Sequence, residues 1–176
     1  TTTCTNPTAT LNGSASGGDG NFSYSWSPST GLSSATSATP TANPSSNTTY
    51  TLTVTDGNGC TDTDVVTVNV NETAPTANAG PNRTTTCTNP TATLSGSGGG
   101  SYSWSPSTGL SSTTAASPTA NPSSTTNYTL TDTGSNGCTD TDVVTVTVDE
   151  TAPTANAGPN RTTTCTNPTA SLSGSE

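Results

Sequence analysis

Histidine, lysine, glutamine and methionine are absent from this chain, and these absences remove whole classes of chemistry. Without histidine or lysine, most general-base and Schiff-base mechanisms have no side chain to carry them. The lack of lysine excludes Lys–Asn crosslinks, and the lack of glutamine excludes Thr–Gln esters, two covalent bonds that staple some surface domains. We therefore predict that the segment is not an enzyme and that it needs no cofactor.

Positive charge is almost absent as well. Arg83 and Arg161 are the two cations against eleven acids, which gives a formal net charge of −9 and a pI near 4.1. Nucleic acids and anionic membrane surfaces both attract Lys and Arg, so we expect neither as a partner. No apolar run approaches the length of a membrane span, which predicts no membrane insertion. No signal peptide is recognisable, as expected of an internal piece of a longer secreted protein.

Apolar side chains are scarce, at 25% hydrophobic and 4% aromatic residues, too few for one large core. Threonine makes up roughly a quarter of the chain, a bias that fits two different structures. One is a disordered, mucin-like stalk. The other is a set of thin β-sandwiches that carry threonine on their solvent faces.

Internal repetition favours the sandwiches and divides the chain. Residues 73–92 (TAPTANAGPNRTTTCTNPTA) recur letter for letter at 151–170, and shorter matches join 1–11 to 84–94, 24–34 to 102–112 and 60–68 to 138–146. The matches predict a first sandwich at 1–72 (repeat 1), a second at 73–150 (repeat 2), and the opening strands of a truncated third at 151–176. Residues 73–81 are expected to form a short, Pro-containing linker that limits bending.

Apolar residues alternate with threonine in both repeats, the pattern of strands with one buried face. The alternating sets are Tyr50, Leu52 and Val54; Val66, Val68 and Val70; and Val144, Val146 and Val148. No segment has helical periodicity. Identical placement in two copies argues for a packed core and against a disordered stalk. The predicted fold class is all-β, with tandem immunoglobulin-like (PKD-like) β-sandwich repeats.

Two aromatic pairs have the same two-residue spacing: Tyr24 with Trp26, and Tyr102 with Trp104. Exposed indoles would suit a carbohydrate-binding module. Because each pair occupies one face of a predicted strand, we expect all four side chains in the cores instead.

With these motifs, the sequence resembles the PKD-like and related immunoglobulin-like repeats of large bacterial surface proteins, especially those of Bacteroidota. The matching features are the ANAGP segment at 77–81 and the strands predicted at 24–26, 50–56 and 65–70. The resemblance implies export to the cell surface and service as spacer, adhesin or carbohydrate-binding module. At Asn82 and Asn160 the sequence departs from the Asp that many PKD-like repeats carry.

The five cysteines predict disulfides, because a thin extracellular domain gains stability from a staple. The favoured disulfides lie within repeats, Cys4–Cys60 and Cys87–Cys138, and leave Cys165 unpaired. Cys60–Cys87 with Cys138–Cys165 is an alternative, and a bond between neighbouring repeats, such as Cys4–Cys138, is another. That last choice avoids a bond between the turn after the first strand of a sandwich and the hairpin between its last two strands. These two turns lie at opposite ends of a sandwich. Free thiols are the remaining alternative, and no CxxC spacing supports zinc.

Two acidic pairs, Asp62 with Asp64 and Asp140 with Asp142, each lie on one face of a predicted strand. We expect solvated acids that keep an exposed strand from pairing with other chains. Calcium is the alternative ligand for these oxygens. Replacement of a nearby acid, Asp56, by glycine in repeat 2 argues against a complete calcium site.

Taken together, these features predict a structural or adhesive segment of an extracellular surface filament. The expected partners are neighbouring repeats or copies of the chain itself, with surface glycans or host cell surfaces as contacts for exposed loops. A passive spacer and a carbohydrate-binding module are the alternatives. Residues 151–176 either continue into a longer polypeptide or complete a neighbouring subunit as a donated strand. The first is favoured, because residues 1–11 already give repeat 1 its own opening strand.

Overall fold

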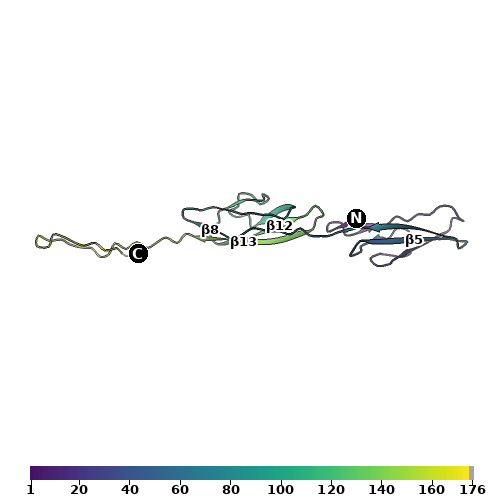
Figure 1. The fold of residues 1–176 in the computed structure, drawn as a ribbon, viewed down its shortest axis with the longest axis horizontal. Helices are drawn as coiled ribbons and strands as arrows, with labels where there is room; N and C mark the ends of the chain where they lie inside the picture. Colours follow the sequence, from purple (N-terminus) through teal and green to yellow (C-terminus); the bar gives the residue numbers. More distant parts are fainter. Residues whose placement is uncertain (175–176) are drawn as a thin grey trace.

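Two β-sandwiches lie end to end in the computed structural model, and a thin extended tail follows them (Figure 1). The structure describes residues 1–174. These residues form no helix, and so none that could cross a membrane. The predicted all-β fold of tandem immunoglobulin-like sandwiches is confirmed.

Repeat 1 consists of short and long strands in the order β1 (Thr2–Thr3), β2 (Ala9–Thr10), β3 (Phe22–Ser27), β4 (Thr41–Ala42), β5 (Thr48–Asp56), β6 (Thr61–Val68) and β7 (Val70–Asn71). Repeat 2 follows the same order with β8 (Arg83–Thr86), β9 (Ala92–Thr93), β10 (Ser101–Ser105), β11 (Thr119–Ala120), β12 (Thr126–Thr133) and β13 (Thr139–Asp149).

Each repeat has a main sheet built from its longest strands. In repeat 1, β5 lies between β3 and β6 and is antiparallel to both, and β12 has the same place between β10 and β13 in repeat 2. The first strand of each repeat pairs in parallel with the last, β1 with β7 and β8 with β13. The antiparallel pairs β2–β4 and β9–β11 form the facing layer. The repeats therefore share one sandwich topology.

Aromatic side chains from the main sheets fill the two cores. Trp26 is 5% exposed and Trp104 is 2% exposed. Each indole Nε1 donates a hydrogen bond of 2.9 Å to a backbone carbonyl, that of Ser37 or of Ala115. On the same faces, two partly buried rings pack against the cores: Tyr24 and Tyr102. Both indoles are thus enclosed with their polar atoms satisfied, and neither is open to solvent for stacking on a ligand.

Two buried tyrosines tie the main sheets to the loops. The hydroxyl of Tyr50 donates to the Thr30 carbonyl and that of Tyr128 donates to the Thr108 carbonyl, each at 2.8 Å. Burial raises the pKa of both phenols above the ordinary value of 10.0, so both remain hydrogen-bond donors at neutral pH.

The tail, residues 151–174, extends away from repeat 2 (Figure 1). Its described side chains are exposed apart from the half-buried Gly158, and Leu172 is 85% exposed. Within residues 151–174 no strand forms, and Thr164 and Asn167 make an isolated β-bridge.

Replacing Trp104 by alanine is expected to destabilise repeat 2 by about 3–5 kcal/mol, the usual cost of truncating a buried tryptophan. Chemical denaturation of the variant and the parent measures the difference. In the native parent, both indoles should fluoresce at shorter wavelength than in the denatured chain. Emission typical of water-exposed tryptophan in the native protein would contradict the burial of these rings.

Candidate functional site at the repeat junction

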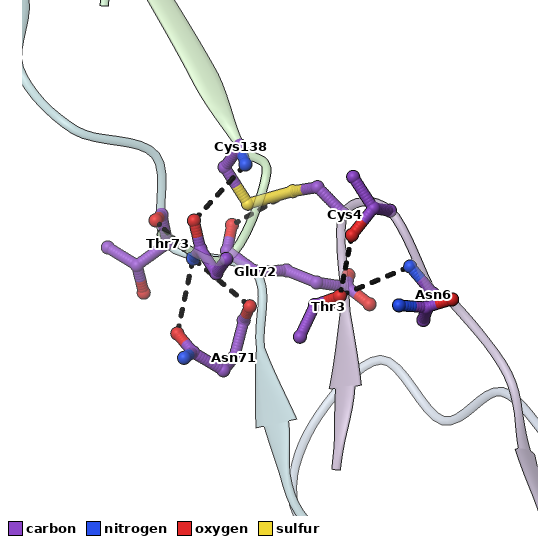
Figure 2. Close-up of a disulfide and its surroundings, with 9 residues drawn as sticks. Thr3, Cys4, Asn6, Asn71, Glu72, Thr73 and Cys138 are labelled. Carbon is purple, nitrogen blue, oxygen red and sulfur yellow. Dashed lines mark hydrogen bonds between the residues drawn. A yellow bond between two sulfur atoms is a disulfide. The ribbon is translucent and has the colours of Figure 1, made fainter. Parts of the chain in front are cut away.

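A disulfide between Cys4 and Cys138 joins the two sandwiches (Figure 2). Cys4 follows β1 in repeat 1, whereas Cys138 lies in the hairpin between β12 and β13 of repeat 2. Their Cα atoms are 5.1 Å apart, and 134 positions separate them in the sequence. The bond is therefore a link between domains and not a staple within one.

The favoured pairing within repeats is wrong in this structure, and the topology explains why. Since β1 runs parallel to β7, Cys4 lies at the end of the sandwich where the last strand finishes. Cys60 lies before β6, at the opposite end. The strands between them span roughly 30 Å, far beyond the Cα separation of about 7 Å that a disulfide tolerates. Three exposed cysteines remain as free thiols: Cys60, Cys87 and Cys165.

Asn136 reinforces the same contact from the hairpin of repeat 2. Its side-chain Nδ2 donates to the carbonyls of Asn71 (3.1 Å) and Thr73 (2.9 Å) and lies 3.2 Å from Asn71 Oδ1. Its Oδ1 accepts the Cys138 amide at 3.1 Å. The Asn136 side chain thereby ties residues 71–73, where the chain leaves repeat 1, to the hairpin of repeat 2 that carries Cys138.

Glycine at position 137 permits the close approach of the hairpin to repeat 1. Gly137 has a φ of +77°, and a Cβ there would overlap the Thr5 side chain. At the equivalent Gly59, which has no neighbouring repeat against it, the same Cβ would meet nothing within 4 Å. The contrast shows how tightly the two repeats abut at the junction.

Residues 73–82, which we call the lead-in segment, form part of repeat 2 and are not a free linker. The Ala77 amide donates to Asp140 Oδ2 at 2.9 Å, and the Ala79 amide donates to Asp142 Oδ2 at 2.8 Å. Between them, Asn78 exchanges two backbone hydrogen bonds with Ser97 on the facing layer. The segment thus forms hydrogen bonds to both layers of the sandwich and covers the open edge between them.

Burial confirms that the lead-in segment belongs to the core of repeat 2. Ala79 is fully buried in the cluster that contains Leu94, Trp104 and Leu130. Val144, on β13, is also fully buried. The linker expected at 73–81 is thus packed into repeat 2, and the alternation Ala77–Asn78–Ala79 carries too few apolar atoms to signal this packing from the sequence.

The acidic pair of repeat 2 has a different role from the predicted one. Instead of repelling an additional strand, Asp140 and Asp142 accept its amides. Backbone amides that donate to the Asp142 carboxylate lower its pKa, first the amide of Ala79 and then that of Val143. Their copies Asp62 and Asp64 lie on β6, exposed. Within residues 1–174, no group of three or more acidic or cysteine side chains gathers as metal ligands do, and calcium stays the untested alternative for these acids.

No protein-family model matches this sequence, and no curated protein matches it either. Several solved structures are distantly similar to this chain. Sidekick-1 immunoglobulin domains 1–5 are 16% identical with a TM-score of 0.37, covering 89% of this chain and 40% of that one. The human desmocollin-1 ectodomain is 11% identical with a TM-score of 0.32, covering 76% and 31%.

Titin domains z1z2, solved with telethonin, are 17% identical with a TM-score of 0.32, covering 82% of this chain and 89% of theirs. The chain spans only about a third to two fifths of the desmocollin and Sidekick structures. Likeness at this level carries no argument about function.

Acid should loosen the lead-in segment through Asp142. Because its folded pKa lies below the ordinary 3.8, the ionised carboxylate stabilises repeat 2 above that pH, and the stabilisation is lost as the pH falls through the folded pKa. At pH 6 the Asp142→Asn variant should therefore have a lower melting temperature than the parent. The difference between the two melting temperatures should shrink by about pH 2–3. Thermal unfolding of dilute protein from pH 6 to pH 2 measures this.

Asp64→Asn, at the equivalent position of repeat 1, is the matched control. Among residues 1–174, the Asp64 carboxylate accepts a hydrogen bond from the amide of its neighbour Val65, at 2.8 Å, and from no other group. A loss for Asp64→Asn equal to that for Asp142→Asn would contradict the role assigned to the lead-in contact.

Proposed function

We propose that this segment is a load-bearing structural repeat of an extracellular fibre, in which each repeat is locked covalently to the next. The observation that carries the proposal is the Cys4–Cys138 disulfide, which joins two sandwiches. Disulfides persist in oxidising surroundings, so the bond favours a location outside the cell. The resemblance to PKD-like repeats of Bacteroidota surface proteins agrees with that location.

The disulfide changes the path of tension through the chain. A pull on the two ends of the segment passes from residues 1–4 through the two sulfur atoms into residues 138–176. Residues 5–137, nearly the whole of both sandwiches, lie outside this path. While the bond is closed, neither sandwich lengthens the segment appreciably by unfolding.

A longer array with the same bond at each junction would be almost inextensible. Cys165 occupies in the third unit the place that Cys4 has in repeat 1. The covalent path between bonds would then contain about 27 residues, from Cys138 to Cys165, which reach about 95 Å at full extension. Two folded repeats span roughly 80 Å, so this path is nearly taut at the folded length.

The alternatives fit the structure less well. A carbohydrate-binding module needs rings open to a sugar, and both Trp26 and Trp104 are buried. A passive spacer needs no covalent bond between repeats, because reach alone serves it. Adhesion through exposed loops is compatible with a fibre, and it would add contacts without changing the mechanical role.

Stretching single chains held at both ends tests the proposal. Unfolding a repeat of about 72 residues without the disulfide should lengthen the chain by about 20 nm. In the oxidised parent, no step of this size is expected from either repeat. In Cys138→Ala, and in the parent after reduction, two such steps should appear.

Cys60→Ala is the matched control, because Cys60 has the equivalent hairpin position in repeat 1 but is a free thiol. It should behave as the oxidised parent does. Two full steps in the oxidised parent would refute the load-bearing role.

A further inference from the structure

An asparagine–glycine pair, Asn136 and Gly137, lies in the hairpin of repeat 2 that also carries Cys138. Asparagine followed by glycine is prone to deamidation, because glycine has no Cβ to shield its backbone nitrogen from the asparagine side chain. The nitrogen attacks the side-chain carbon Cγ, and the ring that forms then opens with water to aspartate or isoaspartate. A chemically labile pair thus lies in the contact between the two repeats.

The hairpin itself restrains the nitrogen that would attack. The Gly137 amide donates a hydrogen bond to the Gly134 carbonyl at 2.9 Å. Ring closure needs this nitrogen to lose its proton and turn toward Asn136 Cγ, so the bond to Gly134 must break first. The hairpin therefore has to open before the pair can react.

Repeat 1 adds a second restraint, on the side chain that would be attacked. Asn136 Nδ2 donates to the carbonyls of Asn71 at 3.1 Å and Thr73 at 2.9 Å, where the chain leaves repeat 1 (Figure 2). The Thr5 side chain packs against Gly137. Rotation of Cγ toward the Gly137 nitrogen would break the hydrogen bonds to residues 71–73, so the reaction requires the junction to separate.

The acceptors around Asn136 also distinguish an amide from a carboxylate. The groups that face Nδ2 are the carbonyl and Oδ1 of Asn71 and the carbonyl of Thr73, all oxygens, and Nδ2 supplies the protons. Deamidation replaces this nitrogen with an oxygen that has no proton to donate at neutral pH. Oxygen would then face oxygen, which leaves these groups unpaired and adds repulsion. Where isoaspartate forms, the longer backbone would also displace Cys138.

We propose that Asn136 is a deamidation site that the closed junction holds unreactive, and that its deamidation after opening prevents the two repeats from closing again. The second reactant is water, so no enzyme is needed. Opening of the junction then becomes permanent, whereas a junction that stays closed remains chemically intact. This inference goes beyond the mechanical role, because it assigns a chemical modification to the junction.

Each step of the reaction exchanges one bond for another. The Gly137 nitrogen gives up its proton and bonds to Asn136 Cγ, the Cγ–Nδ2 bond breaks, and Nδ2 leaves with a proton as ammonia. Water then adds to one carbonyl carbon of the ring and breaks the bond from that carbon to the Gly137 nitrogen, which regains a proton. Addition at Cγ gives aspartate, and addition at the backbone carbonyl carbon gives isoaspartate. No oxidant or reductant takes part.

The Cys4–Cys138 disulfide governs how often the junction opens. The Cα atoms of the two cysteines are 5.1 Å apart, and Asn136 lies two positions before Cys138, so the closed bond keeps the hairpin beside residues 71–73. Once the bond is reduced, the Asn136 hydrogen bonds and the packing of Gly137 must hold the contact, and such contacts open far more often.

Asn58 and Gly59 give the chain an internal reference. They occupy the same hairpin position in repeat 1, where the Gly59 amide donates to the Asp56 carbonyl at 3.0 Å, the same turn bond as in repeat 2. In the 176-residue chain, the Asn58 side chain forms no hydrogen bond to any of the described residues. The two pairs therefore share the hairpin and differ in the tether to a second repeat.

Peptide mapping by mass spectrometry of the 176-residue chain, kept at about pH 7.4 and about 37 °C, measures deamidation at both positions. In the oxidised parent, Asn136 should deamidate at least about tenfold more slowly than Asn58, because only the open fraction reacts. Cys4→Ala removes the disulfide without changing the hairpin, and should speed deamidation of Asn136 by at least about threefold. Cys87→Ala, at the equivalent position of repeat 2, removes a free thiol and should leave both rates as in the parent.

Equal rates at Asn58 and Asn136 in the oxidised parent would overturn protection by the junction. A rate at Asn136 that Cys4→Ala leaves unchanged would overturn it as well. A chain that resists stretching but deamidates equally at the two positions would leave the load-bearing role standing and refute the protected site alone.

Reduction followed by reoxidation in a glutathione buffer tests whether a deamidated junction can close. Asn136→Asp places a carboxylate against the acceptors and should shift the Cys4–Cys138 bond toward the two thiols by at least about tenfold relative to the parent. Asn58→Asp is the matched control and should reoxidise as the parent does. Asn136 lies outside the core that contains Trp104, so an unchanged Trp104 emission should show that repeat 2 remains folded. Reoxidation of Asn136→Asp to the level of the parent would refute the permanent opening.

Discussion

The structure depends above all on the seating of the lead-in segment between the two layers of the repeat that follows it. Two amide-to-carboxylate hydrogen bonds, from Ala77 to Asp140 and from Ala79 to Asp142, fix the segment along β13. The buried Ala79 side chain completes the core beneath it. Because the segment leaves repeat 1 and belongs to repeat 2, the connection between them is part of a sandwich and does not swing freely.

That constraint explains how a chain so poor in apolar residues forms a firm junction. With the lead-in segment seated, the hairpin of repeat 2 abuts the end of repeat 1, where Asn136 and the Cys4–Cys138 bond meet residues 71–73. A disulfide that closes so long a loop removes much of the freedom of the unfolded chain, about 5 kcal/mol in the chain-entropy model. The covalent bond thus adds to the stability of both repeats while it joins them.

The sequence predicted the parts that depend on alternation and repetition. Trp26 and Trp104 lie in the cores on strands that were predicted from two-residue spacing. It did not predict the seat of the lead-in segment, whose alanines give too weak a signal. The pairing of Cys4 with Cys138 was one option among three, because spacing cannot tell which hairpin faces which strand end. That choice needs the parallel register of β1 with β7.

The most direct measurement is amide hydrogen exchange in the dilute, monomeric chain, where two identical segments provide their own comparison. The amides of Ala77 and Ala79 have carboxylate acceptors, whereas those of Ala155 and Ala157 have none among residues 1–174. The account predicts slow exchange at Ala77 and Ala79 and fast exchange at Ala155 and Ala157. Equal rates at the two pairs would show that the lead-in segment is a loose linker and would contradict the account.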